Sequence, residues 1–284
     1  MTLEQDLARR DLTINAIARD ENGAYVDPYR GIADLRAGIL RHVSPAFVED
    51  PVRVLRVARF AARFPFAIAS ETMALMREIV RAGEVDALVP ERVWQEFAKG
   101  LAEATPARMF EVLDECGALG RVLPEWTKID SATSLAALKE AARSAQPLVV
   151  RFAVLFASAP VDAAESAAER LRAPADCRDL ALLLAAQNET LAQGATLRAD
   201  ALVALFHAVD AWRRPERFDL LLAASSCVAV ARQRTDHDRA LARIKRALAA
   251  AAAVDAGAIA RAHPEDIPGA LRRARIAAVE SALA

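Results

Sequence analysis

Two groups of arginines have the residue types and the spacing that could bind phosphates. In the stretch EDPVRVLRVARFAARF, four arginines recur at steps of three, three and four residues: Arg53, Arg56, Arg59 and Arg63. On an α-helix this spacing places their guanidinium groups on one stripe, where like charges repel unless carboxylates or an anionic ligand neutralise them. Only Glu49 and Asp50 are acidic and nearby in sequence. The stripe therefore suits a polyanion, although a solvated helix face would show the same spacing.

The second group lies near the start of the chain, where Arg9, Arg10 and Asp11 are consecutive and Thr13 and Asn15 follow. An arginine fork can hold a phosphate with two parallel hydrogen bonds, so Arg10 could grip a triphosphate. Threonine and asparagine add short hydrogen-bonding side chains beside it. A helix start with surface ion pairs would explain the same triplet without any ligand.

The elements that must position these groups are a small α/β opening and a long helical remainder. Asn22-Gly23 between residues 17–20 and 24–27 predicts a β-hairpin with a tight primed turn, which needs positive φ at both positions. A short extended piece follows at residues 39–43. Asp50 is a typical N-cap residue, and Pro51 suits the first helical position. These residues predict a helix over 51–64 that ends before Pro65.

The remaining chain has helical periodicity with few strand signals. Start and stop residues predict helices over 70–83, 89–102 and 105–120, whereas 127–146 is typical of a polar, irregular connection. From residue 148 onward helix follows helix, with breaks near residues 160, 174, 194, 215, 232–238 and 264–269. The predicted fold class is mainly α, with a small α/β segment at the N-terminus.

Composition narrows the class of protein. The chain has 284 residues, of which 54% are hydrophobic, and neither a membrane span nor an export signal is evident, so we expect a soluble cytoplasmic protein. Of the 37 basic residues, all but four are arginines, which favours phosphate recognition, although arginine-rich codon usage would give the same bias. Cys116, Cys177 and Cys227 lack metal-ligand spacing and are expected to be reduced thiols.

Four stretches then occur in an informative order: RRDLTINAIA (9–18), DPYRGIADL (27–35), EDPVRVLRVARFAARF (49–64) and ERVWQEFAK (91–99). In this order and at these intervals they resemble the motifs of class II tRNA nucleotidyltransferases, which comprise the bacterial CCA-adding enzymes and their poly(A) polymerase relatives. The resemblance continues through VLDECGALGRVLPEW and resumes at DAWRRPERFDLL and LRRARIAAVESAL, so it covers most of the chain.

This resemblance implies roles for individual residues. Asp50 and Arg53 would form a protein template that hydrogen-bonds the Watson–Crick edges of CTP and then ATP, because a carboxylate accepts from an exocyclic amine while a guanidinium donates to ring acceptors. Arg10 and Asn15 would line the wall that holds the nucleotide's phosphates. The side chains that continue this face or brace it from the neighbouring helix would be Arg56, Arg59, Glu91 and Arg92.

The resemblance also implies a division of the chain and an RNA partner. It divides into a head remnant at 1–44, a neck at 45–126 and a helical body and tail at 127–284. The body and tail would track the acceptor arm of tRNA by shape and backbone charge. The candidate residues for this contact are Arg213, Arg214, Arg217, Arg272, Arg273 and Arg275.

One part of the family's catalytic machinery is not found in these 284 residues. In the family, paired carboxylates that bind Mg²⁺ follow a glycine-rich turn upstream of the Arg-Arg-Asp motif, and Glu4 and Asp6 are a poor substitute because they lack that turn. We therefore expect no metal site here, an inactive or nearly inactive polypeptide, and self-association through a sheet edge left exposed by missing strands.

A second motif of some relatives is degenerate in this chain. A His-Asp pair of the HD phosphohydrolase type is expected after RFAVLF, but Ala157, Ser158 and Ala159 occupy that place. The only His-Asp dipeptide is His237-Asp238, which we expect in a solvated loop. The sequence thus predicts no metal-dependent phosphatase activity.

The resulting functional prediction is a CCA-adding tRNA nucleotidyltransferase that uses ATP and CTP and, by family, Mg²⁺. Two alternatives stay open. The first is a non-catalytic RNA-binding module, or a subunit complemented by a separate catalytic chain. The second is a poly(A) polymerase, which is less favoured because such enzymes usually carry a long basic C-terminal extension and this chain ends in VESALA.

Overall fold

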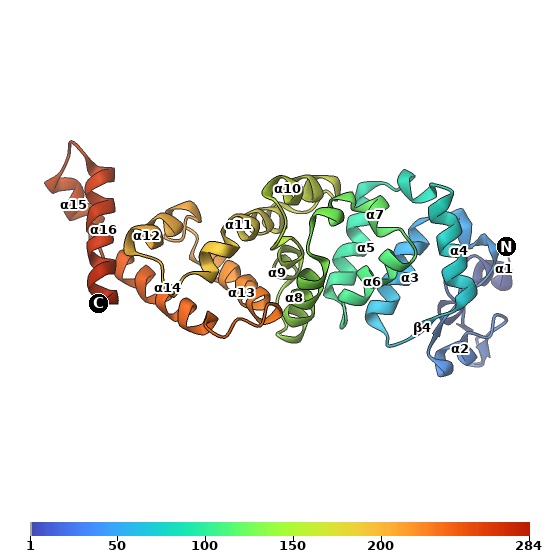
Figure 1. Ribbon diagram of the computed structural model, residues 1–284. Helices are drawn as coiled ribbons and strands as arrows, with labels where there is room; N and C mark the ends of the chain where they lie inside the picture. The colour runs from blue at the N-terminus through green and yellow to red at the C-terminus, as the bar shows by residue number, and fades with distance from the viewer. Residues whose placement is uncertain (1) are drawn as a thin grey trace.

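The computed structural model describes residues 2–284, which form an elongated row of helices with the N-terminal α/β segment at one end and the last helices at the other (Figure 1). Two small two-stranded sheets lie in the first part of the chain. Within residues 2–284, no helix is both long enough and apolar enough to cross a membrane. The mainly α fold class is confirmed.

The N-terminal segment contains the predicted hairpin. Its elements are α1 (Leu3–Ala8), η1 (Thr13–Asn15), β1 (Ala18–Arg19), β2 (Tyr25–Val26), α2 (Gly31–Ala37) and β3 (Ile39–Leu40). Strands β1 and β2 pair antiparallel, but the prediction of a two-residue primed turn was wrong. Asp20 N–H donates to the Ala24 carbonyl, and of the three residues between them only Gly23 has a positive φ. This three-residue loop needs a single left-handed residue.

A second sheet joins this segment to the next part of the chain. Strand β3 pairs in parallel with β4 (Ala67–Ile68), placing Ile39 opposite Ala67, and an isolated bridge joins Leu12 to His42. The extended piece at 39–43 was predicted, whereas its partner was not. Two residues of strand carry too little alternation to be recognised from sequence.

Residues 45–128 form helices that pack around α3. The elements are η2 (Pro45–Glu49), α3 (Val52–Arg63), α4 (Ser70–Arg81), η3 (Glu84–Ala87), α5 (Pro90–Ala102), α6 (Ala107–Glu115), α7 (Leu119–Val122) and η4 (Pro124–Lys128). Helix α3 packs against both α5 and α6, with its apolar residues fully buried. The single helix predicted over 105–120 was wrong, because Gly117 adopts φ +83° and separates α6 from α7.

The prediction of an irregular connection over 127–146 was also wrong. Helix α8 (Ser131–Arg143) occupies most of it, and the Asp130 carboxylate caps its start by accepting from the Thr133 N–H. Ala137, Leu138 and Ala141 are buried on the face that packs against later helices. Of the polar residues that suggested a loop, Ser131 and Lys139 are exposed, whereas Ser134 is buried and its hydroxyl donates to the Leu155 carbonyl.

The rest of the chain is helical, as predicted. It contains α9 (Leu148–Ala153), η5 (Val154–Phe156), α10 (Val161–Arg170), α11 (Ala175–Ala192), α12 (Ala199–Ala208), α13 (Pro215–Ala231), α14 (His237–Ala252), α15 (Ala256–Ala262) and α16 (Ile267–Leu283). One break was missed, between α14 and α15, where the Asp255 carboxylate caps α15.

The three cysteines are buried and free, as expected. Burial raises the pKa of Cys177 to about 12 and that of Cys227 to about 11, so both stay protonated thiols near neutral pH.

The prediction that His237 lies in a solvated loop was wrong. It opens α14, is only 6% exposed, and its Nε2 lies 3.1 Å from the Ser226 hydroxyl on α13. Burial lowers its pKa, although the nearby charges of Asp238 and Asp236 oppose this shift. The error arose because a polar sequence break fixes where a helix starts but not whether that start folds back onto a neighbour.

Buried histidines predict a loss of stability in acid. Burial also lowers the pKa of the half-buried His42, so both rings bind a proton more weakly in the fold than in the unfolded chain, where the ordinary pKa is 6.5. The free energy of unfolding should fall as pH drops below 6.5, by up to about 1.4 kcal/mol per pH unit for each ring. Urea unfolding of wild type and His237→Gln between about pH 7.5 and 5.5 should show a shallower dependence in the variant. A pH dependence in His237→Gln that is as steep as in wild type would contradict a role for this ring.

The stretch DPYRGIADL is folded tightly against the Arg-Arg-Asp segment. The Asp27 carboxylate accepts from the N–H groups of Gly31 and Ile32 and thereby caps α2, while the Thr13 hydroxyl donates to Asp34 at 2.7 Å. A Cβ at Gly31 would lie 2.0 Å from the Thr13 carbonyl oxygen. Only glycine permits this approach.

We therefore expect Gly31→Ala to lower the free energy of unfolding by about 1–3 kcal/mol, because the methyl group meets backbone rather than a movable side chain. Urea unfolding monitored by circular dichroism measures the change. Gly120→Ala on α7 is the matched control, since nothing lies within 4 Å of its added Cβ. Equal free energies of unfolding for the two variants would show that the close approach of Gly31 to Thr13 does not require glycine.

Candidate functional site

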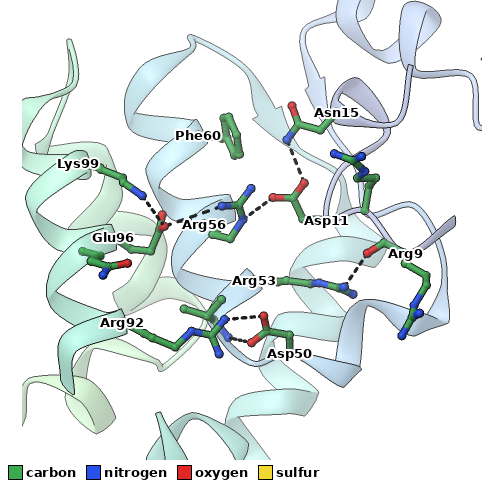
Figure 2. Close-up of a pocket in the computed structure, with 13 residues that line it drawn as sticks. Arg9, Asp11, Asn15, Asp50, Arg53, Arg56, Phe60, Arg92, Glu96 and Lys99 are labelled. Atoms are coloured by element: carbon green, nitrogen blue, oxygen red, sulfur yellow. Dashed lines mark hydrogen bonds and ion pairs between the residues drawn. The ribbon is translucent and has the colours of Figure 1, made fainter. Parts of the chain in front are cut away.

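A cavity of about 610 Å³ lies where the N-terminal segment, α3 and α5 meet (Figure 2). Its lining combines basic, acidic and amide side chains with one aromatic ring: Arg9, Arg10, Asp11, Asn15, Asp50, Val52, Arg53, Arg56, Phe60, Arg92, Gln95, Glu96 and Lys99. Six of these side chains are cationic and three are carboxylates. The excess of positive charge suits a phosphate-bearing ligand.

Most of the residues predicted to face a nucleotide line this cavity. Arg10 and Asn15 come from the N-terminal segment, and Asp50, Arg53 and Arg56 come from the start and first turns of α3. They lie some 40 residues apart in sequence and meet only through the packing of α3 against the segment that contains Asp11.

Asp11 is the centre of this contact, and sequence reasoning did not assign it a role. It is 6% exposed and accepts from Arg56 Nε at 2.7 Å, from the Asn15 amide at 3.0 Å and from the Leu12 N–H. Burial alone would raise the pKa of Asp11, but the hydrogen bond from Asn15 and the charge of Arg56 outweigh burial and lower it. Asp11 therefore stays ionised and fixes both neighbouring side chains.

Arg59 does not line the cavity, unlike the other arginines predicted to face the nucleotide. It is 7% exposed and turns towards α5, where its Nε donates to Glu96 at 2.6 Å and its Nη1 lies 3.6 Å from Glu103. Part of the arginine stripe is thus neutralised by protein carboxylates rather than by a ligand. These carboxylates are more than 35 residues away in sequence, so spacing along α3 had no means of revealing them.

Asp50 and Arg53 lie next to each other at the entrance of α3. Asp50 Oδ1 accepts from the Val52 N–H at 3.2 Å, and Oδ2 accepts from Arg92 at 2.7 Å. Helix α3 begins at Val52 with Pro51 as its N-cap, one residue later than predicted. Arg53 donates to the carbonyls of Ala46 and Arg9, which uses two of its five N–H groups. The Asp50 carboxylate, an acceptor, therefore lies next to the Arg53 guanidinium, a donor, at the wall of the cavity. Hydrogen bonds to neighbouring groups fix both side chains in place.

The two residues expected to brace the neck differ in position. Arg92 lines the cavity and binds Asp50, whereas Glu91 points to Arg172, which follows α10, at 3.2 Å between Nε and Oε1. Glu96 and Lys99 continue the Arg92 face of α5 and were missed as site residues. Their spacing from Arg92, at four and seven residues, is the signal that could have found them.

The carboxylates of the cavity do not fit a magnesium site. Asp11 pairs with Arg56, Asp50 with Arg92, and Glu96 with Arg59, so each already has a cationic partner. Within residues 2–284 no group of three histidine, cysteine, aspartate or glutamate side chains could hold a metal ion.

The arginines predicted to contact tRNA fall into two groups. Arg213, Arg214 and Arg217 line a cavity of about 590 Å³ at the start of α13, together with Asp176 and Asp179. On α16, Arg272 and Arg273 are exposed, whereas the Arg275 guanidinium lies 3.9 Å from the centre of the Trp212 ring. Burial lowers the pKa of Arg275. Arg275 thus has a packing role between α16 and the segment before α13.

Comparisons with known proteins show which family this chain resembles. Residues 1–41 match the family described as "Poly A polymerase head domain", and residues 65–129 match "Probable RNA and SrmB- binding site of polymerase A". The "Multifunctional CCA protein" of Azoarcus sp. (strain BH72) is 49% identical, covering 99% of this chain and 77% of its own length. That of Burkholderia vietnamiensis (strain G4 / LMG 22486) is 48% identical, covering 100% of this chain and 80% of its own.

Solved structures give the same result for the fold. "The complex structure of CCA-adding enzyme with ATP" has a TM-score of 0.71 at 17% identity, covering 99% of this chain and 70% of that one. "Thermotoga maritima CCA-adding enzyme complexed with tRNA_CCA" also has 0.71, at 19% identity, covering 99% and 73%. With close to half of its residues shared with curated CCA proteins along nearly its whole length, the chain belongs to the class II family of CCA-adding tRNA nucleotidyltransferases.

Proposed function

We propose that this chain serves in the addition of C, C and A to tRNA 3′ ends, with CTP and ATP as substrates, in the cytoplasm. The observation that carries the proposal is the adjacent placement of Asp50 and Arg53 on the wall of a cationic cavity. An acceptor beside donors matches cytosine and adenine, which both present an exocyclic amine next to a ring nitrogen acceptor. Guanine and uracil present a carbonyl oxygen at the corresponding position and would leave Asp50 facing another acceptor.

Arg10 and Arg56 are the proposed contacts to the nucleotide's phosphates, with Asn15 beside them. The Arg10 side chain is half-exposed, and among residues 2–284 its one partner is Asp6, one turn earlier on the surface, so an incoming triphosphate can take over that bond. Arg56 is held by Asp11, which leaves other N–H groups of its fork free to donate. Arg59 acts indirectly in this proposal, because it fixes Glu96 and thereby the spacing of α3 and α5.

Arg92 is the proposed positioning residue for the template. Its guanidinium binds Asp50 Oδ2, which restricts the carboxylate to one orientation. Glu91, which pairs with Arg172, would connect the same helix to the later helices. Donors and acceptors that are already fixed in place improve discrimination between bases, because fewer side chains must be ordered when the nucleotide binds.

The acceptor arm of tRNA is the proposed partner of the later helices. Support comes from the relatives named as CCA proteins and from a fold neighbour solved with tRNA, while the names of the curated relatives favour CCA addition over poly(A) synthesis. Of the arginines proposed for this contact, Arg213, Arg214, Arg272 and Arg273 are exposed. The division of the chain at residues 44 and 126 stays a prediction, and so does self-association through an exposed sheet edge.

The template predicts a change in base preference. Wild-type chain should bind CTP and ATP more tightly than UTP and GTP. Asp50→Asn should weaken binding of CTP by about 10- to 100-fold, because a hydrogen bond to a charged acceptor is lost and an amide donor can meet the amine. Binding of UTP should change little or improve. Isothermal titration calorimetry with the four nucleotides measures the preference.

The matched control is Glu21→Gln, which neutralises an exposed carboxylate on the hairpin loop outside the cavity. It should leave all four affinities unchanged. An Asp50→Asn variant that keeps the wild-type preference for CTP over UTP would remove Asp50 from the template.

A second prediction concerns catalysis by the 284 residues alone. In the family the carboxylates that bind Mg²⁺ precede the Arg-Arg-Asp motif, and those of the present cavity are paired with arginines. We expect no incorporation above background when this polypeptide is mixed with Mg²⁺, radiolabelled CTP and ATP, and tRNA that lacks its terminal CCA. A CCA-adding enzyme with its full head is the positive control. Robust incorporation would show that residues within this chain supply the missing carboxylates.

A further inference from the structure

Arg151 on α9 lies outside the cavity proposed for CTP and ATP, yet it is bonded to the end of a helix that forms one wall of that cavity. Its Nη1 donates to the carbonyls of Leu101 and Glu103 at 2.8 and 3.1 Å, and its Nε donates to the Gln146 carbonyl at 2.8 Å. Leu101 and Glu103 lie at the end of α5, whereas Gln146 belongs to the connection between α8 and α9. One guanidinium therefore joins three segments of the chain.

Arg151 acts as a cap on the C-terminus of α5. Each of its bonds within residues 2–284 goes to a backbone carbonyl, and burial lowers its pKa. The last carbonyls of a helix lack partners within the helix and carry the negative end of its dipole, so a cation is favourable there. The next residue, Phe152, packs edge to face on Trp94 of α5, with 5.4 Å between the ring centres. Helix α9 thus holds α5 on the side away from the cavity.

Glu103 connects this cap to the cavity. Its carbonyl accepts from Arg151, while its Oε1 lies 3.6 Å from Arg59 Nη1. Arg59 in turn donates through Nε to Glu96 at 2.6 Å, and Glu96 lines the cavity. The second oxygen of Glu96 lies 3.9 Å from Arg56 Nη1. We call this series of contacts, from Arg151 through Glu103, Arg59 and Glu96 to Arg56, the Arg151 network.

The middle of the Arg151 network has little freedom to rearrange. The side chains of Arg59, Glu96 and Glu103 are 9%, 7% and 19% exposed. A charge enclosed in this way cannot turn into water to find another partner, so the position of each side chain depends on that of its neighbour. The bond between Asp50 and Arg92 lies near the other end of α5 and is not part of this series.

We propose that Arg151 is a positioning residue for Arg56, the proposed contact to the nucleotide's phosphates. It fixes Glu103, and through Arg59 and Glu96 this sets the place of the Arg56 guanidinium. The inference rests on the proposed function and adds to it a part for α9, which contributes no residue to the cavity. Because the network ends at Arg56 and not at Asp50, Arg151 affects binding of the phosphates and leaves the choice of base unchanged.

The experiment compares wild type with Arg151→Met in titrations with CTP, UTP and cytidine, followed in proton–nitrogen NMR spectra of the 284-residue chain. Methionine keeps an unbranched apolar side chain but removes every donor, so Glu103 is no longer fixed. Binding of CTP and of UTP should weaken by the same factor, about 3- to 30-fold. Binding of cytidine should stay unchanged, because cytidine has no phosphate to meet Arg56. Arg151→Lys keeps a charged donor and should recover part of the loss.

Arg170→Met is the matched control. Arg170 on α10 donates to the buried Glu125 at 3.1 Å, and neither residue belongs to the Arg151 network. This variant should lower the free energy of unfolding but leave the CTP affinity of the folded chain unchanged. A merely structural role of Arg151 would give the same pattern in Arg151→Met, so the titrations distinguish the two roles.

Two further measurements keep the test decisive. If Arg151→Met fails to fold, Glu103→Gln takes its place, because it leaves the carbonyl bond to Arg151 intact and neutralises the carboxylate beside Arg59. It should weaken CTP binding and spare cytidine in the same way. The Arg59 Nε–H, which donates to buried Glu96, should give an NMR signal that exchanges faster with water in Arg151→Met than in wild type or Arg170→Met. This readout needs no nucleotide.

The outcomes separate this inference from the proposed function. A wild-type chain that binds no CTP would contradict the proposed function, whatever the Arg59 signal does. Wild-type CTP affinity in folded Arg151→Met, or in Glu103→Gln if that variant is used, would overturn the role of Arg151. So would an equal loss of affinity for cytidine and for CTP, because it would show a general loss of structure at the cavity.

Discussion

The pairing of arginines on α3 with carboxylates from both flanking elements is the constraint on which the rest of the site depends. Arg56 meets Asp11 on one side, and Arg59 meets Glu96 on the other. Asp11, Arg59 and Glu96 are all less than 9% exposed, so a break in either pair would leave a charge buried without its partner. Such a break is strongly destabilising. The N-terminal segment, α3 and α5 are therefore fixed relative to one another before any ligand binds.

This rigid arrangement explains how a protein surface could select a base. Asp50 is held by the Val52 N–H and by Arg92, and Arg53 is held by two backbone carbonyls. A ligand that matches these directions gains hydrogen bonds without reordering the wall. One that presents a carbonyl to Asp50 leaves two acceptors opposed, and an unsatisfied polar group in a partly buried site costs about 1–3 kcal/mol.

Because the helices form an elongated row, the proposed binding sites lie at different points along the molecule (Figure 1). The cavity proposed to bind nucleotides, here called the nucleotide cavity, lies near the N-terminal end. The arginines proposed for tRNA lie further along, at the start of α13 and on α16. Helix α3 contributes Phe60 to the nucleotide cavity, and the ring of Phe60 stacks on that of Phe64. Changes in Phe64 packing therefore have a direct route to the wall of the nucleotide cavity.

The resemblance of the sequence motifs to the family placed six of the thirteen residues that line the cavity beside α3. The order of motifs, the hairpin and the helical remainder were determined by the sequence itself. They depend on local rules, because periodicity fixes the face of a helix and turn residues fix its ends. Only the tertiary structure decided that Arg59 turns away from the cavity, that β3 pairs with β4, that residues 131–143 are a packed helix and that His237 is buried. Each of these depends on a neighbour that is distant or unspecified in sequence. A local pattern specifies which side of an element will be covered, whereas only packing specifies what covers it.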